Sequence, residues 1–168
     1  PIKSVGHGIT CISDLENEDE VRKVILALSQ DIGHKLRVHG LSTRTVQIYV
    51  RGNDLFGSQF QCKLPIKTQL PSEIAAAFRC FKERYAWNTK VRAVTVRAIE
   101  LSPKSDAEQI SLFDNVQQRI AKEKVQDAVE EIRGRFGKAA VTYASLLGDL
   151  KMPTDGRDKV KMPGIMYQ

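Results

Sequence analysis

Basic side chains concentrated in one part of the chain could bind phosphate groups. The 168-residue sequence carries 26 Lys and Arg against 20 Asp and Glu, and the whole surplus lies in residues 1–104, which hold 16 basic and 10 acidic side chains. Five of those acids fall between residues 14 and 20, so residues 21–104 have 15 basic and 5 acidic side chains. Such a concentration of positive charge favours a nucleic-acid partner. An ordinary solvated surface is the alternative.

A five-residue peptide, Gln-Ile-Ser-Leu-Phe at 109–113, could dock on another protein. Its glutamine offers an amide to a polar niche, and its last two residues offer adjacent apolar groups to a hydrophobic pocket. The peptide follows a polar stretch at 102–108, where exposed apolar side chains are otherwise unfavourable. The candidate docking residues are Gln109, Ile110, Ser111, Leu112 and Phe113. In the alternative interpretation, Leu112 and Phe113 pack against the start of the following helix.

No group of residues predicts catalysis or a metal site. The histidines and cysteines are widely spaced and have no paired acid, nucleophile or Cys-x-x-Cys pattern beside them: His7, His34, His39, Cys11, Cys62 and Cys80. The cysteines are expected to be buried or unreactive thiols. The acidic run at 14–20 is better explained as a helix N-terminus than as a metal site. We therefore expect no cofactor and no enzymatic activity in this part of a protein.

Hydrophobic periodicity predicts alternating strands and helices. Strands are expected at 3–12, 45–51, 58–64 and 91–101, and helices at 17–40 and 71–85. The first helix has clear ends, because Asn17 can cap it with Glu20 three residues on, and Gly40 can terminate it. The order β-α-β-β-α-β predicts an α+β, ferredoxin-like domain, in which two helices cover one face of a four-stranded antiparallel sheet.

The second face of that sheet would be open to water or a ligand. Alternation puts amides, hydroxyls and basic groups there, without a carboxylate: Thr45, Gln47, Tyr49, Gln59, Gln61, Lys63, Thr95 and Arg97. Within 45–51 the same alternation sets Arg51 on the side of Thr45, Gln47 and Tyr49. Such groups donate hydrogen bonds to phosphate oxygens and read no base sequence. The face therefore predicts non-specific, salt-sensitive binding to a nucleic-acid backbone.

The rest of the chain divides into a linker, a third helix and a tail. We expect a first domain at 1–104, a linker with the docking peptide at 105–115, a helical extension at 116–150 and a flexible tail at 151–168. In the extension, apolar residues at helical spacing form one stripe: Ala121, Val125, Ala128, Val129, Ile132 and Phe136. A lone amphipathic helix is marginally stable in water, so the stripe is expected to pack on the domain, on another copy or on a partner.

Four segments carry a family resemblance, and they follow one another in the family's order. They are Lys3-Ser4-Val5-Gly6 with the residues up to Thr10, the segment 40–50 with Arg-Thr-Val at 44–46, the docking peptide at 109–113, and Ile-Arg-Gly-Arg-Phe-Gly at 132–137. Together they resemble the C-terminal part of Y-family translesion DNA polymerases of the bacterial UmuC or DNA polymerase IV type. The Gly-His-Gly opening and the position of the peptide before a further helix are similar to the Gram-positive UmuC-like branch.

The resemblance implies a little finger domain that grips the phosphates of duplex primer-template DNA, and a peptide that docks on the replication sliding clamp. The implied DNA contacts are Ser4, Val5, Gly6, His7, Gly8, Arg44, Thr45, Gln47, Lys63, Arg92 and Arg97. Tethering by the clamp would offset weak intrinsic affinity for DNA. The resemblance also implies that the catalytic palm and its Mg²⁺ belong to a longer protein, which serves translesion synthesis and DNA repair in the bacterial cytoplasm.

Two other functions stay open at this point. An RNA-binding ferredoxin-like module would need aromatic side chains for base stacking, but Gln59, Gln61 and Lys63 occupy the third strand. The second is an interaction scaffold without nucleic acid. No apolar run reaches the roughly 20 residues of a membrane span, so no membrane partner is expected. Because the chain starts at Pro1 without Met, we expect it to be a fragment of a longer protein.

Overall fold

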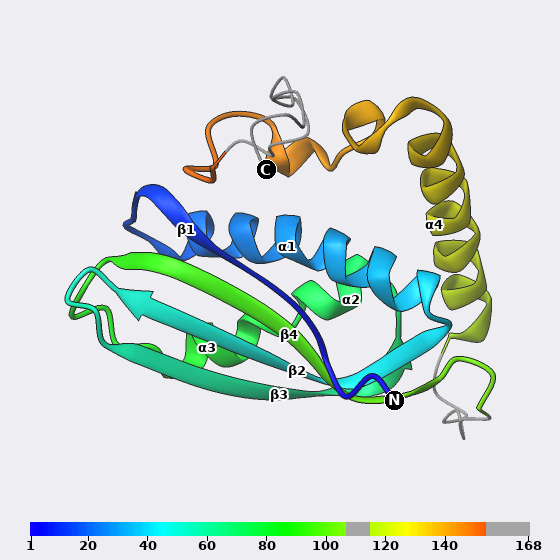
Figure 1. Cartoon of the computed structure of the whole chain (residues 1–168), viewed down its shortest axis with the longest axis horizontal. Helices are drawn as coiled ribbons and strands as arrows, with labels where there is room; N and C mark the ends of the chain where they lie inside the picture. Colours follow the sequence, from blue (N-terminus) through cyan, green and yellow to red (C-terminus); the bar gives the residue numbers. More distant parts are fainter. Residues whose placement is uncertain (107–114, 154–168) are drawn as a thin grey trace, which may run out of the picture.

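The computed structural model describes residues 1–106 and 115–153 (Figure 1). Its strands are β1 (Val5–Leu15), β2 (Leu41–Gly52), β3 (Gly57–Thr68) and β4 (Val91–Pro103). Its helices are α1 (Glu18–Val38), α2 (Pro71–Ala75), α3 (Phe78–Arg84) and α4 (Val116–Phe136), followed by the short 3-10 turns η1 (Lys138–Ala140) and η2 (Ala144–Leu146).

The four strands form one antiparallel sheet in the order β1-β4-β2-β3. Each helical connection skips one strand: α1 carries the chain from β1 past β4 to β2, and α2 with α3 carries it from β3 past β2 to β4. These helices pack on the same side of the sheet (Figure 1). The predicted α+β, ferredoxin-like layering is confirmed, with β4 and β2 as the inner strands.

The core lies between the helices and the sheet because both carry one apolar face. The apolar stripe of α1 is fully buried: Val21, Val24, Ile25, Leu28, Ile32 and Leu36. Val46, Ile48 and Val50 of β2 belong to the same core. Burial of each such side chain contributes about 1.5–3 kcal/mol, before the cost of ordering the chain is counted. This packing decides which face of the sheet the helices leave open.

Two short helices, α2 and α3, occupy the segment 71–85, where the sequence predicts one helix. Between them the Ala77 N–H donates to Ile74 O at 3.1 Å and the Cys80 N–H donates to Ala77 O at 3.0 Å. Hydrogen bonds over three residues tighten the backbone into a 3-10 turn. The tighter turn keeps both Ala77 and Phe81 fully buried, so packing divides the helix.

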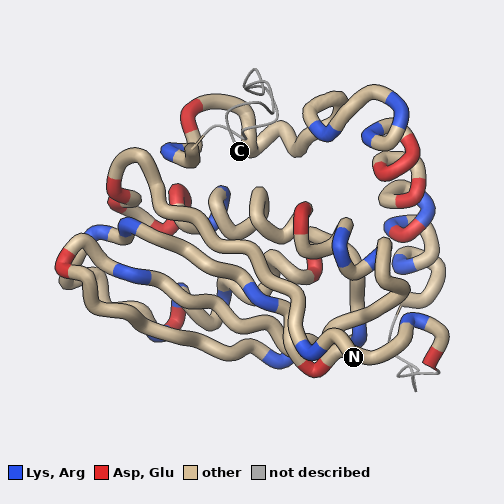
Figure 2. The backbone as a smooth tube through the Cα atoms, viewed as in Figure 1, with Lys and Arg blue, Asp and Glu red and all other residues tan. Residues whose placement is uncertain are grey.

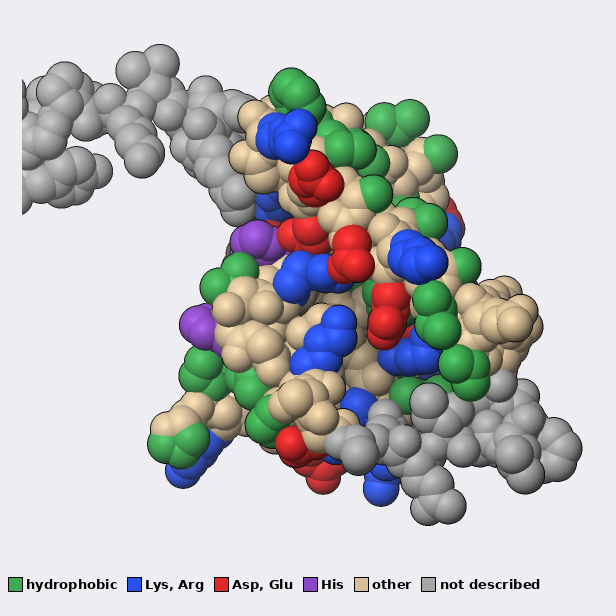
Figure 3. All heavy atoms as spheres, turned by 90° about the vertical axis from the view of Figure 1, so that its right-hand side faces the viewer, with side chains coloured by type: hydrophobic (Ala, Val, Ile, Leu, Met, Phe, Trp, Pro, Cys, Tyr) green, Lys and Arg blue, Asp and Glu red, His purple; other side chains and the backbone are tan. Residues whose placement is uncertain are grey.

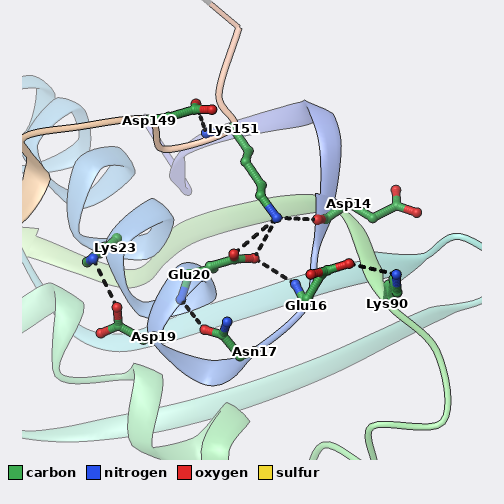
Figure 4. Close-up of polar contacts among 9 residues, drawn as sticks. All are labelled: Asp14, Glu16, Asn17, Asp19, Glu20, Lys23, Lys90, Asp149 and Lys151. Atoms are coloured by element: carbon green, nitrogen blue, oxygen red, sulfur yellow. Dashed lines mark hydrogen bonds and ion pairs between the residues drawn. The ribbon is translucent and has the colours of Figure 1, made fainter.

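The acidic run caps α1 and anchors a distant part of the chain (Figure 4). The Asn17 side chain accepts from the Glu20 N–H at 3.0 Å, as an N-cap does, and the Glu20 carboxylate accepts from the N–H of Glu16, the residue before the cap, at 2.7 Å. Lys151 Nζ lies 3.0 Å from the same carboxylate and donates to Asp14 O at 3.0 Å. The predicted helix N-terminus is confirmed, and the ammonium group of Lys151 pairs with the Glu20 carboxylate there.

Helix α4 stands at one end of the domain (Figures 1 and 2). Polar side chains make its contacts with the domain. Arg119 Nη1 donates to both carboxylate oxygens of Glu73 at 2.8 Å, and its Nη2 donates to Lys67 O at 2.8 Å. Three further pairs join α4 to α1: Asp127 with Arg37, Glu130 with His34, and Arg133 with Gln30. After α4, residues 138–153 return across α1 (Figure 1).

Candidate nucleic-acid interface

The open face of the sheet is a grid of polar side chains, because alternate residues of paired strands lie side by side on one face. Four rows cross it: Gly6, Arg97, Gln47 and Gln61; Gly8, Thr95, Tyr49 and Gln59; Thr10, Ala93, Arg51 and Gly57; and Ile99, Thr45 and Lys63. We call these residues the open face. The predicted alternation of β2 and β3 is confirmed, since Phe60, Cys62 and Leu64 are buried on the opposite side.

Three basic side chains lie on the open face, one in each of three rows. Arg97 and Lys63 are exposed, whereas Arg51 is half-buried. The Nε atom of Arg51 is buried and makes no hydrogen bond within residues 1–106 and 115–153. Its cross-strand neighbours Ala93 and Gly57 have little or no side chain that could accept one. Because this Nε is buried, a phosphate oxygen would reach it only after the Arg51 side chain turned outward. Figure 2 shows basic residues distributed along the strands.

Glycines allow side chains to lie across the strands of this face. A Cβ atom at Gly8 would stand 2.3 Å from Thr95 Oγ1, and one at Gly57 would stand 2.3 Å from Tyr49 Oη. Only glycine leaves room for these contacts. The Thr95 and Tyr49 side chains therefore lie flat over the neighbouring strands.

One carboxylate reaches the open face, and here the sequence prediction is wrong. Glu100 of β4 has a φ of +51°, a left-handed conformation that costs about 1–2 kcal/mol in a residue other than glycine. Its carboxylate accepts a hydrogen bond from the Thr45 hydroxyl. In a regular strand Glu100 would point to the same side as the buried Ala98, which is why alternation excluded it. Thr45, a predicted DNA contact, is buried, and its hydroxyl already donates to Glu100.

Two of the predicted DNA contacts in β1 point away from the open face. Val5 is buried in the core, and His7 Nδ1 lies 2.6 Å from an oxygen of Asp31 in α1. Lys138 pairs with the other oxygen of Asp31. Burial raises the pKa of the Asp31 carboxyl, but Lys138 and His7 outweigh burial and hold that pKa below its usual value. The side chains of Val5 and His7 therefore join β1 to the helical layer.

The remaining predicted contacts outside the grid lie at its margins. Ser4 precedes β1 and is exposed. Arg92 is an extra residue of β4 in its pairing with β2, and its Nε lies 3.3 Å from Asp14. Arg44 is half-buried, and its Nη2 donates to Pro65 O at 3.4 Å. The structure thus brings Arg97, Gln47, Lys63 and the buried Thr45 together with Gly6 and Gly8. The other predicted contacts lie outside this grid: Ser4, Val5, His7, Arg44 and Arg92.

A family model, the impB/mucB/samB family C-terminal domain, matches residues 2–112. This range contains the whole sheet and the helices that cover it. The chain belongs to the impB/mucB/samB C-terminal domain family. The predicted family is thereby confirmed; the matched range contains the first two segments and all but the last residue of the docking peptide, whereas the segment 132–137 lies beyond it.

Curated relatives of this family member are DNA polymerases IV. The chain is 39% identical over 150 residues to DNA polymerase IV of Acetivibrio thermocellus, and 31% identical over 150 residues to DNA polymerase IV 2 of Bacillus subtilis. The two matches cover 89% and 86% of this chain, but 38% and 35% of the relatives. The chain therefore spans little more than a third of the length of these polymerases.

Solved structures of Y-family proteins share the fold of this family member. One is a complex of a beta-clamp processivity factor and the little finger domain of PolIV, with a TM-score of 0.50 and 18% identity over 66% of this chain and 99% of that chain. Another is a Y-family DNA polymerase chimera, with a TM-score of 0.51 and 13% identity over 60% of this chain and 29% of that chain. At such identities the likeness establishes the little finger fold alone.

Arg51 is a further candidate contact in this family domain, and it is absent from the DNA contacts predicted from the sequence. Alternation placed it on the open face, but only the structure reveals its unpartnered Nε beside small neighbours. The docking peptide at 109–113 lies outside the described residues, so its role stays a prediction.

Neither a metal centre nor a membrane span is found where the chain is described. In residues 1–106 and 115–153, no three His, Cys, Asp or Glu side chains are grouped so that they could hold a metal ion. The Mg²⁺ implied for a longer polymerase has no fitting donor set among them. Over the same ranges, no helix has the length and apolar character needed to cross a bilayer.

Proposed function

We propose that this chain is the DNA-binding and clamp-binding C-terminal region of a lesion-bypass DNA polymerase. The observation that carries the proposal is the open face, whose basic and amide side chains project from a sheet that is packed on its other side. Membership of the family and similarity to polymerases IV support it. We infer that polymerisation and Mg²⁺ binding belong to the part of such a polymerase that this chain does not span.

The proposed contacts are made to the DNA backbone. Arg97, Lys63 and Arg51 would donate to phosphate oxygens, and the amides of Gln47 and Gln61 would add neutral hydrogen bonds. Because phosphates are the same at every base pair, the grip tolerates damaged template. Three phosphate contacts predict a slope of about −3 when the logarithm of the binding constant is plotted against that of the salt concentration.

Charge reversal at Arg97 tests this interface. Arg97→Glu should weaken binding to a labelled primer-template duplex by about tenfold or more, and should lower the salt slope by about 1. Arg84→Glu is the matched control, because Arg84 is also exposed but lies on α3, on the covered side of the sheet. If the two variants lose affinity equally, net charge explains the effect; if Arg97→Glu binds like the parent, the open face is not the interface.

Clamp docking is supported by the peptide at 109–113 and by the similar structure, in which a little finger domain is in complex with a beta-clamp processivity factor. The double variant Leu112→Ala with Phe113→Ala should lose binding to purified clamp. Val116→Ala with Ile120→Ala is the control, since it removes two exposed apolar side chains from the adjacent helix. Undiminished clamp affinity in the first variant would restore the interpretation that Leu112 and Phe113 pack on α4.

RNA binding is the alternative that the open face favours least. Tyr49 is the one aromatic residue among the open-face positions, whereas recognition of single strands depends on several stacked bases. Single-stranded RNA as competitor in the duplex assay separates the two functions. Preference for RNA over duplex DNA would overturn the proposed function.

A further inference from the structure

Helix α4 turns its polar side to the domain and its apolar side to solvent. Arg119, Glu130 and Arg133 contact α1, α2 or the segment that follows α4. The opposite side carries exposed apolar residues, which we call the outer stripe: Ala121, Val125, Ala128, Ile132 and Phe136. Figure 3 shows hydrophobic side chains in a line beside the charged ones on this end of the molecule. A continuous apolar line on a helix that is already docked indicates an interaction surface.

The outer stripe has the spacing of a helix-pair interface. Ala121, Val125, Ala128 and Ile132 follow one another at intervals of four, three and four residues, which is the a/d pattern of a heptad. Small and large side chains alternate along it. In an antiparallel pair centred between Val125 and Ala128, each Val125 would pack on the other copy's Ala128, and each Ala121 on the other copy's Ile132. The volumes are therefore self-complementary.

Charges beside the stripe are self-complementary in the same arrangement. Lys124 and Glu131 occupy equivalent heptad positions on one flank of the stripe. Flanking positions of this kind face each other in an antiparallel pair, so Lys124 of each copy would meet Glu131 of the other. In a parallel pair they would face Val129 and Phe136 instead. The charge pattern thus favours the antiparallel arrangement.

We propose that the outer stripe binds a second copy of this chain, with the two α4 helices antiparallel about a two-fold axis between Val125 and Ala128. The stripe lies opposite the side that contacts the domain, so the two domains would stand on opposite sides of the helix pair. This pairing leaves the open face of both sheets accessible, and it does not depend on the proposed function.

Sedimentation equilibrium of the full 168-residue chain tests the pairing. The parent should be a reversible dimer, and Val125→Glu should weaken the dimer by at least about tenfold, because it buries a carboxylate against the other copy's Ala128. Val38→Glu is the matched control. Val38 ends α1 and is 66% exposed, compared with 64% for Val125, so the same change at the same exposure should leave the dimer constant within about twofold.

A charge swap tests the antiparallel register. Lys124→Glu should weaken the dimer several-fold, because it sets Glu against Glu131 of the other copy, and Lys124→Glu combined with Glu131→Lys should restore it. Circular dichroism of each variant checks that α4 is intact. A chain that is monomeric at about 1 mM overturns the proposal. Equal loss in Val125→Glu and Val38→Glu, or a charge swap that fails to restore the dimer, also overturns it.

Discussion

Replacing Arg119 with Met should release the first half of α4 from the domain. Arg119 is 20% exposed and Glu73 25% exposed, and three hydrogen bonds of 2.8 Å connect this guanidinium to Glu73 and to Lys67 O. A well-placed hydrogen bond that involves a charged group contributes about 1.5–3 kcal/mol. The three bonds here are made by one guanidinium, so their contributions do not simply add, and partial exposure to solvent weakens them. We therefore expect a total loss of about 2–3 kcal/mol in the free energy that holds α4 to the domain.

Native-state hydrogen exchange measures this loss directly. A change of about 2–3 kcal/mol corresponds to roughly 30- to 150-fold faster exchange of the α4 amides. The sheet amides should be unaffected, because α4 contributes little to the core beneath α1. A double-mutant cycle with Glu73→Gln separates the ion pair from the rest of the packing.

Arg135→Met is the matched control for this prediction. Arg135 belongs to the same helix and forms an ion pair of 3.0 Å with Glu131, but the two side chains are 70% and 65% exposed. Solvent screens such a pair, so its loss should leave exchange in α4 almost unchanged. The reasoning is refuted if Arg119→Met and Arg135→Met accelerate exchange equally, or if neither does.

Three further predictions concern the domain itself. Gly8→Val should lower the free energy of unfolding by about 1–3 kcal/mol in urea titrations, because a Cβ would stand 2.3 Å from Thr95 Oγ1; an unchanged midpoint would contradict the close approach. The pKa of Asp31 in the folded chain lies below its ordinary value of 3.8, so the ionised carboxylate stabilises the fold above that pH. This contribution is lost as the pH falls through the folded pKa. Lys138→Met should therefore make the free energy of unfolding fall less steeply between about pH 5 and pH 2. Burial and the nearby Asp14 carboxylate raise the pKa of Cys11 to about 11, so iodoacetamide at about pH 8 should alkylate this thiol only after the chain unfolds. Rapid labelling of Cys11 in the folded chain would refute the raised pKa.

The sequence by itself determined the features whose signals are local. A 3.6-residue period placed the buried face of α1, and the residue types at its ends predicted the Asn17 cap and the terminal Gly40, whose φ is +64°. A two-residue period placed Phe60 and Ile48 inward and Gln47 outward. The four family segments are also properties of the sequence alone. These signals hold because each depends on neighbours within a few residues.

Only the tertiary structure decided which surfaces meet. It fixed the strand order, divided the second helix at Ala77, and turned the carboxylate of Glu100 onto the open face. A period reveals which side of a helix is apolar, but not whether that side finds a partner. In α4 the polar side docks, because Arg119 and Arg133 reach groups 46 and 103 residues away in the sequence, and no local pattern encodes such distant pairs.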